Sequence, residues 1–393
     1  MAPPPGLDEL KARALALVPV LRTRAAQAEE LRRVPDQSIA DLHQSGLFRA
    51  FQPKRLGGSE LPYRAMIDLG SILARGCGST AWVLTNLASH HWMLGMWPKA
   101  AQDEIWGADG PDVLIGSAFA FPSGRAVKVK GGHSLKGRWP FSSGVDPSKW
   151  NFIGALVEEE GQALEPRVFI VKASDYAIID NWQASGLAGT GSKDVEIEDA
   201  FVPDHRGLAP AQIAGGPTPG SAVNPGPLYR LPTFSLFPFI LSGISLGLAQ
   251  GAIGEFTQSM RARAGTYAGK KLAELATLQL RVAEASALTD AAEKLMISDC
   301  EEATRLTEAG KIAAIEDRVR WRRDGAYGAG MCAKAVDLLF TGAGGAAIYK
   351  SNPLQRIWRD VHAANGHYLV SWDMAGTLYG RVALGLPPDM PVL

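Results

Sequence analysis

Several histidines stand where an imidazole could hold or move a proton. His90 and His91 lie inside an apolar stretch that continues into Trp92, and His362 and His367 lie near the C-terminus. Imidazole titrates near neutral pH, so it is the side chain best suited to proton transfer there. Histidines on an apolar helix more often pack than react, so the pattern alone leaves a packing role and a catalytic role open.

A glycine-rich string, Gly186-Leu-Ala-Gly189-Thr-Gly191-Ser, looks at first like a phosphate-binding loop. A dinucleotide-binding loop needs a strand before it and a helix after it. Here a strand pattern, 194–202, follows the string. A tight turn that feeds a strand explains the glycines, so the string does not indicate an NAD(P)H site.

Composition and cysteine usage exclude several classes of protein. The chain has 393 residues, 46% of them hydrophobic, and its 40 basic and 40 acidic side chains cancel. A zero net charge argues against a nucleic acid partner. Cys77, Cys300 and Cys332 form no CxxC pair, no cluster has metal-ligand spacing, and a reducing, cytoplasmic location is expected. The apolar stretch 234–249 is broken by polar residues and glycines, so no membrane span is expected.

The elements that must position these side chains follow the order helix, strand, helix. Helical periodicity covers 6–110, including 62–75 and 79–96. Period-2 alternation covers 112–205, with a hairpin at 126–132. Strands are predicted at the following ranges: 151–158, 167–172 and 194–202. After a Pro/Gly-rich connector the helical period returns near 236. The predicted domains are 1–111, helical; 112–206, β; 207–235, connector; and 236–393, a helical bundle. This order disfavours a Rossmann sheet.

The wider glycine string carries a family resemblance. Together with Asp194-Val195 and Phe201-Val202-Pro203 it resembles a signature of the acyl-CoA dehydrogenase superfamily, as do three further strings: Trp139-Pro-Phe-Ser142-Ser143-Gly144, Phe340-Thr-Gly342-Ala-Gly344-Gly345 and Arg356-Ile-Trp358-Arg359-Asp360. The resemblance implies an N-terminal helical domain, a middle β-barrel domain and a C-terminal four-helix bundle. It implies Trp139, Ser142 and Ser143 beside a flavin. Arg263, Gly344 and Gly345 match segments that reach a neighbour's cofactor in a homotetramer.

Membership of this superfamily leaves the reaction open. A dehydrogenase needs a carboxylate base, and 361–370 contains none. The chain is more similar to oxygenase components of two-component flavin monooxygenases, including 4-hydroxyphenylacetate and secosteroid phenol hydroxylases. Local matches are Gly76-Cys-Gly-Ser-Thr-Ala-Trp82, His91-Trp92, Ser117-Ala-Phe119 and Ser142-Ser-Gly-Val-Asp146. The string Asp146-Pro-Ser-Lys-Trp150 departs from those relatives, which often carry His after the Asp.

The resemblance implies an activity and roles for residues. Reduced FMN or FAD would come from a separate NAD(P)H-dependent reductase and react with O2 through a flavin C4a-hydroperoxide to hydroxylate a phenolic or indolic small molecule. His91 is the expected acid–base group, with Ser117 as its partner on the substrate oxygen and His367 as a polar anchor. Ser142 is favoured over Ser143 near flavin N5. His90 is expected to point away, and His362 to be structural.

Two alternatives remain open at this point. One is an FAD-dependent acyl-CoA dehydrogenase that holds its flavin tightly. The other is a non-catalytic flavin-binding relative that kept the fold and lost the pocket. The sequence does not distinguish FMN from FAD, nor carbon from nitrogen or sulfur as the oxygenated atom.

Overall fold

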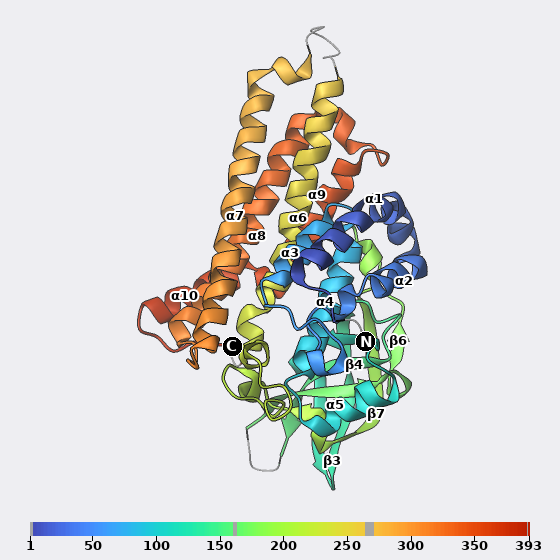
Figure 1. The fold of residues 1–393 in the computed structure, drawn as a ribbon, viewed down its shortest axis with the longest axis vertical. Coiled ribbons are helices and arrows are strands. Elements are labelled where there is room, and N and C mark those ends of the chain that lie inside the picture. Colours follow the sequence, from blue (N-terminus) through green and yellow to red (C-terminus); the bar gives the residue numbers. More distant parts are fainter. Residues whose placement is uncertain (1–2, 160–162, 264–270, 391) are drawn as a thin grey trace.

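A computed structural model describes residues 3–159, 163–263, 271–390 and 392–393. A helical region and a β-sheet occupy one end of the molecule, and a bundle of long helices extends away from them (Figure 1). The elements occur in the predicted order, helices, then strands, then helices.

Five helices form the N-terminal region: α1 (Leu7–Leu31), α2 (Asp36–Gln44), α3 (Ala65–Ala74), α4 (Gly78–Leu94) and α5 (Lys99–Ala108). The helices α3 and α4 agree with the predictions at 62–75 and 79–96. Both are apolar on all sides, which is typical of helices enclosed by other elements. Every residue of α3 is buried, and every residue of α4 except Asn86 is buried.

The middle region is one mixed sheet with eight strands: β1 (Ile115–Ala118), β2 (Gly124–Val129), β3 (Gly132–Ser142), β4 (Trp150–Glu158), β5 (Glu165–Lys172), β6 (Ala177–Ile179), β7 (Lys193–Pro203) and β8 (Gly207–Leu208). The three predicted strands and the hairpin are confirmed.

The expected barrel is not closed. Hydrogen-bonded neighbours run in the order β6-β7-β3-β2-β4-β5-β8, and β1 pairs in parallel with β4. Among the described residues no ladder joins β6 to β8, so the domain is an open sheet. Its inner face buries a core of its own that includes Trp139, Ile153 and Phe169.

The C-terminal region contains α6 (Thr233–Ala262), α7 (Ala276–Glu308), α8 (Ile315–Ala343), α9 (Pro353–Asn365) and α10 (Trp372–Ala383). Helix α6 begins at Thr233, within the predicted connector. Pro238 lies inside α6 and has no N–H, so the carbonyl of Phe234 lacks its usual helical donor. Arg322 Nη1 of α8 donates to that carbonyl at 2.9 Å, which ties α8 to the first turn of α6.

Among the residues that the structure describes, two helical segments are long and apolar enough to cross a membrane, judged by length and composition alone. In Thr233–Ala262, 89% of the most apolar stretch is buried inside the fold, so packing accounts for its apolar character. In Ile315–Ile348 only 39% of the most apolar stretch is buried, which leaves apolar surface on α8 without a cover in this single chain.

Candidate active site

The candidate active site lies along one face of α4. Trp82, Asn86 and His90 are spaced four residues apart, so they lie on the same face of the helix, one turn after another. Trp82 meets the C-terminal region at one end of this face, and His90 meets the sheet at the other. Asn86 lies between them.

His90 contacts β1. Its Nδ1 lies within hydrogen-bond distance of the carbonyl oxygen of Ile115, and since a carbonyl only accepts, Nδ1 carries the proton. In the neutral ring Nε2 is then a hydrogen-bond acceptor. Burial lowers the pKa of His90 to about 4, so the ring is neutral at pH 7.

The expected orientation of the two neighbouring histidines is reversed. His91 is fully buried on the opposite side of α4, where its ring stacks on Trp106 and its Nδ1 accepts from Trp106 Nε1 at 3.1 Å. Gln52 Nε2 lies 3.4 Å from the same nitrogen. Burial, aided by nearby His90, lowers the pKa of His91 to about 3. His91 therefore faces α5, whereas His90 faces the sheet.

Aromatic rings surround His90 on the side of the sheet. The ring centroid of His90 lies 5.5 Å from that of Phe152 and 6.4 Å from that of Phe119. Phe119 is in turn 5.8 Å from both Phe234 and Phe237, at the start of α6. We call Phe119, Phe121, Phe152, Phe234 and Phe237 the phenylalanine cluster. Such a cluster offers flat apolar surfaces to an aromatic ligand and excludes water.

A chain of hydroxyl groups meets Trp82 at the other end of the face. Thr190 Oγ1 donates to the carbonyl of Leu187, so Thr190 accepts from Ser192, and Ser192 accepts from Ser143, each across 2.7 Å. Trp82 Nε1 donates to Ser143 at 3.1 Å. The hydroxyl hydrogen of Ser143 is therefore committed to Ser192.

His367 lies against Trp82, with 5.8 Å between ring centroids. The backbone N–H of Leu369 donates to His367 Nδ1 at 3.2 Å, so the neutral ring carries its proton on Nε2 and is a donor there. Burial lowers the pKa of His367. His362, expected to be structural, pairs with Asp337 at the surface, 2.9 Å away.

Ser142 lies beside β1, on the other face of the sheet from the phenylalanine cluster. It is fully buried, and its Oγ accepts from Asn151 Nδ2 at 2.9 Å. Among the described residues its own hydroxyl hydrogen has no acceptor, and the buried Asn151 Oδ1 has no partner. A Cβ on Gly116 would lie 3.3 Å from Asn151 Oδ1 and 3.5 Å from Ser142 Oγ, so a glycine leaves both groups uncovered by a side chain. Ser117, half-buried, is the next residue along β1.

Trp139 does not fit the flavin-contacting role expected for it. The ring is fully buried in the core of the sheet, and Trp139 Nε1 donates to the carbonyl of Gly154 at 2.6 Å. The nearby aromatic ring with an open face is Phe141, which is 64% exposed. Its φ of +66° is rare for a residue with a side chain, and its ring meets Trp182 edge to face at 6.3 Å.

The glycine string from 186 to 192 is a packed turn, as its sequence context favoured. A Cβ on Gly186 would lie 2.1 Å from the carbonyl oxygen of Arg359, and Gly191 has a φ of +57°. The buried carboxylate of Asp360 accepts from the N–H of Leu187 at 2.6 Å. These contacts fix the hydroxyl chain of Thr190 and Ser192 between α4 and α9.

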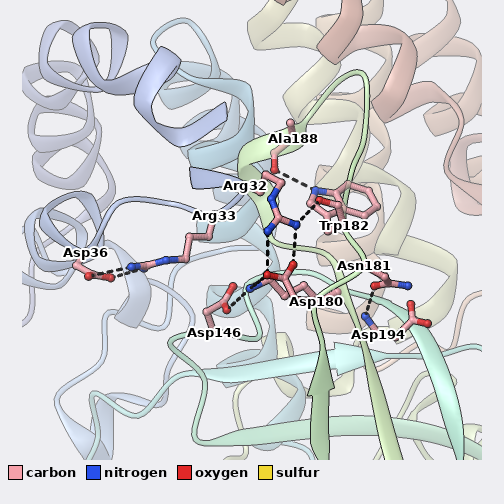
Figure 2. A network of polar contacts seen from close by, with 10 residues as sticks. Arg32, Arg33, Asp36, Asp146, Asp180, Asn181, Trp182, Ala188 and Asp194 are labelled. Atoms are coloured by element: carbon pink, nitrogen blue, oxygen red, sulfur yellow. Dashed lines mark hydrogen bonds and ion pairs between the residues drawn. The ribbon is translucent and has the colours of Figure 1, made fainter. Parts of the chain in front are cut away.

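An ion-pair network joins the end of α1 to the sheet next to this turn (Figure 2). Arg32 adopts a left-handed conformation as the C-cap of α1, and both of its terminal nitrogens bind Asp180, at 2.7 and 2.9 Å. Lys193 Nζ, largely buried, lies 2.6 Å from Asp146. A Cβ on Gly191 would contact the second oxygen of Asp146, so these charges lie directly beside the glycine turn.

Arg263, Gly344 and Gly345 lie away from these groups. Arg263 caps the C-terminal end of α6, and the two glycines follow α8, at the end of the bundle farthest from the sheet (Figure 1). A hollow of about 320 Å³ opens beside them, lined by residues that include Phe256, Met260, Ala343, Asn352 and Leu354. Within one chain the structure does not bring these three residues to the α4 face.

Comparison with known proteins decides the family. A family model described as the C-terminal domain of acyl-CoA dehydrogenase matches residues 239–372. The oxygenase subunit HsaA of a flavin-dependent monooxygenase from Rhodococcus jostii is 36% identical over 374 residues, which cover 95% of this chain and 97% of that protein. The oxygenase component of an FADH2-dependent resorcinol hydroxylase from a Rhizobium strain is 35% identical over 390 residues, covering 96% and 95%.

The chain belongs to the oxygenase components of flavin-dependent monooxygenases. The crystal structure of 3-HSA hydroxylase from Rhodococcus superposes with a TM-score of 0.93 at 35% identity, covering 98% of this chain and 99% of that one. It is therefore an enzyme of the oxygenase branch, and the dehydrogenase and non-catalytic alternatives are set aside. The family sequence pattern predicted this branch correctly, but it did not show that His90 faces the sheet and the phenylalanine cluster.

Proposed function

We propose that this enzyme hydroxylates an aromatic small molecule with O2, using reduced flavin that a separate NAD(P)H-dependent reductase delivers. The observation that carries the proposal is the α4 face. It holds an imidazole acceptor, His90, among phenylalanine rings at one end, and an imidazole donor, His367, beside Trp82 at the other.

The residues present fit a flavin ring. A flavin needs flat apolar contacts and a few polar groups along one edge. Phe141 offers an open apolar ring, and the Ser142-Ser143 pair of β3 offers hydroxyl groups for one edge, with Ser143 next to Trp82 of the α4 face. When bound, reduced flavin supplies the activation of O2. FMN and FAD both remain compatible with these groups.

Substrate handling falls to His90 and Ser117. A phenol reacts best with an electrophilic oxygen when its O–H bond is polarised, and free phenol loses its proton only near pH 10. His90 Nε2 is the acceptor that would hold this proton, with Ser117 contacting the same oxygen. The phenylalanine cluster keeps water out, so that activated oxygen reacts with the ring and is not released as peroxide.

The decisive experiment compares two adjacent variants. His90→Ala should reduce product formation by roughly 10²–10⁴-fold, the usual contribution of a positioned acid–base group, while oxygen uptake continues and hydrogen peroxide accumulates. His91→Ala should change product formation per folded molecule by less than a few-fold. The opposite result, loss of hydroxylation in His91→Ala alone, would return the role to His91.

His367→Ala tests the other end of the face. We expect weaker substrate binding, because a donor that holds the ring is lost, with a smaller effect on the maximal rate. Equilibrium binding of the substrate in the absence of flavin separates these two effects. A lower maximal rate with unchanged affinity would contradict the anchoring role.

We base the proposal that the enzyme is a homotetramer on the end of the C-terminal bundle farthest from the sheet. In a homotetramer Arg263, Gly344 and Gly345 would reach the flavin of a neighbouring copy, and the hollow beside them would receive part of it. The half-covered α8 supports this assembly, as do exposed Tyr327 and Trp372, whose rings lie 5.4 Å apart.

A further inference from the structure

Asn86 is the one residue of α4 whose side chain is not buried. All other residues of this helix are buried, including those on either side of Asn86. Its side chain is half-buried, so part of the carboxamide is accessible in the middle of an otherwise enclosed helix. That place lies between Trp82 and His90, on the face that the proposed function uses.

The amide nitrogen of Asn86 makes a hydrogen bond within α4, whereas its carbonyl oxygen makes none among the described residues. Its Nδ2 donates to the carbonyl of Trp82 at 2.9 Å, one turn earlier on the same helix. This bond fixes which end of the carboxamide is nitrogen, and it holds the side chain along the face. Among the described residues Oδ1 makes no hydrogen bond, so it remains an acceptor for a ligand.

The spacing between Asn86 and His90 sets the size of the ligand group that could span them. Four helical residues rise by about 6 Å, which is comparable to the separation of two oxygens on opposite sides of one benzene ring. His90 Nε2 and Asn86 Oδ1 are both acceptors, so both ring substituents would be donors. A ring with one hydroxyl would leave Asn86 Oδ1 facing apolar carbon, which costs binding free energy.

We propose that Asn86 determines specificity by accepting a hydrogen bond from a second donor on the substrate ring. The substrate class is then an arene with two hydrogen-bond donors across the ring, such as a dihydroxyarene or an aminophenol. This inference rests on the proposed function, since it places the first hydroxyl at His90.

The experiment measures binding of two probes of equal size, 1,4-dihydroxybenzene and 4-methylphenol, to the full chain by calorimetry without flavin. The readout is the ratio of their dissociation constants. Asn86→Leu, which removes the carboxamide at similar volume, should shift this ratio against 1,4-dihydroxybenzene by roughly 2- to 10-fold, the value of one hydrogen bond. Asn86→Ala should shift it in the same direction, so a folding defect in one variant does not decide the result.

Thr85→Val is the matched control. Thr85 lies on α4 beside Asn86, but its hydroxyl donates to the carbonyl of Ala81, 3.1 Å away, and faces away from the site. The ratio should stay unchanged in this variant. An unchanged ratio in both Asn86 variants, or an equal shift in Thr85→Val, would overturn the inference and leave the proposed function intact. Failure of the wild-type chain to bind 1,4-dihydroxybenzene would also overturn the inference, whereas failure to hydroxylate any aromatic compound when a flavin reductase is supplied would overturn the proposed function.

Discussion

At the scale of single residues, the two serines of the Ser142-Ser143 pair differ in what their hydroxyl groups are free to do. Ser143 is fixed at both sides, by Trp82 and Ser192, whereas Ser142 only accepts, from Asn151. A donor that is not already committed is the one available to a ligand. The preference for Ser142 over Ser143 near the flavin stays a prediction, because Ser142 has the free donor whereas Ser143 is the one that contacts Trp82 of the α4 face.

We predict that Ser142→Ala raises the ratio of hydrogen peroxide to hydroxylated product several-fold with little change in substrate affinity. The reason is that a single hydrogen bond at the reacting ring contributes roughly 0.5–1.5 kcal/mol. Peroxide and product are measured in the same reaction, with Ser143→Ala as the comparison. A change in substrate affinity alone would assign Ser142 to the substrate.

At the scale of elements, the sequence could not predict which side of α4 faces the sheet or which residues of β3 face the core. The helix α4 was predicted near its true bounds, but it is apolar on every side, so its periodicity does not say which side faces the sheet. His90 and His91 could not be told apart on that basis. On β3 the register shifts between Leu135 and Gly137 and again between Trp139 and Ser142. Each shift changes which residues face the core, so alternation could not place Trp139.

The interface between α7 and α8 should make stability depend on pH. Asp299 is buried there, and burial, together with nearby Asp324, raises its pKa to about 7. A carboxyl whose pKa is raised in the folded state stabilises the fold below its unfolded pKa of about 4. It loses that contribution as the pH rises towards 7.

Asp299→Asn should therefore increase the free energy of unfolding, and by more at pH 8 than at pH 5. Its Oδ1 can still accept the hydrogen bond that Arg320 donates at 2.8 Å. Urea unfolding at the two pH values measures the effect. Asp290→Asn, an exposed site on the same helix, should show no such pH-dependent gain. Equal gains at pH 5 and pH 8 would contradict the argument.

At the scale of the whole molecule, the described part of the chain contains no βαβ unit of the kind that binds a nicotinamide cofactor, because its strands form a mixed sheet with mainly antiparallel pairs. We predict that the purified enzyme with NADH, flavin and O2 does not oxidise NADH. Addition of an unrelated flavin reductase should start hydroxylation. Absorbance at the NADH band follows the reaction, and NADH loss without reductase would refute the two-component proposal.

The assembly of the enzyme is a second prediction at this scale. Light scattering at micromolar concentration should give the mass of four chains. Exposed apolar side chains at the C-terminal end, including Met374, Leu384 and Leu386, would then be covered by neighbouring copies. Replacement of Trp372 by Glu should shift the mass towards smaller species. A wild-type mass equal to one chain, 41.9 kDa, would contradict the tetramer.

The pairing of Arg32 with Asp180 has a consequence for how the chain is made. The two residues are 148 positions apart, so the C-cap of α1 gains its partner only after the sheet has been synthesised. At about 5–20 residues per second, translation separates them by roughly 7–30 s. During that interval the N-terminal helices are incompletely packed, because the strands that follow them have not yet been synthesised. Nascent chains that end before residue 180 should therefore be protease-sensitive and depend on chaperones, and the N-terminal helices should become resistant only in chains extended through α6, which packs on α3.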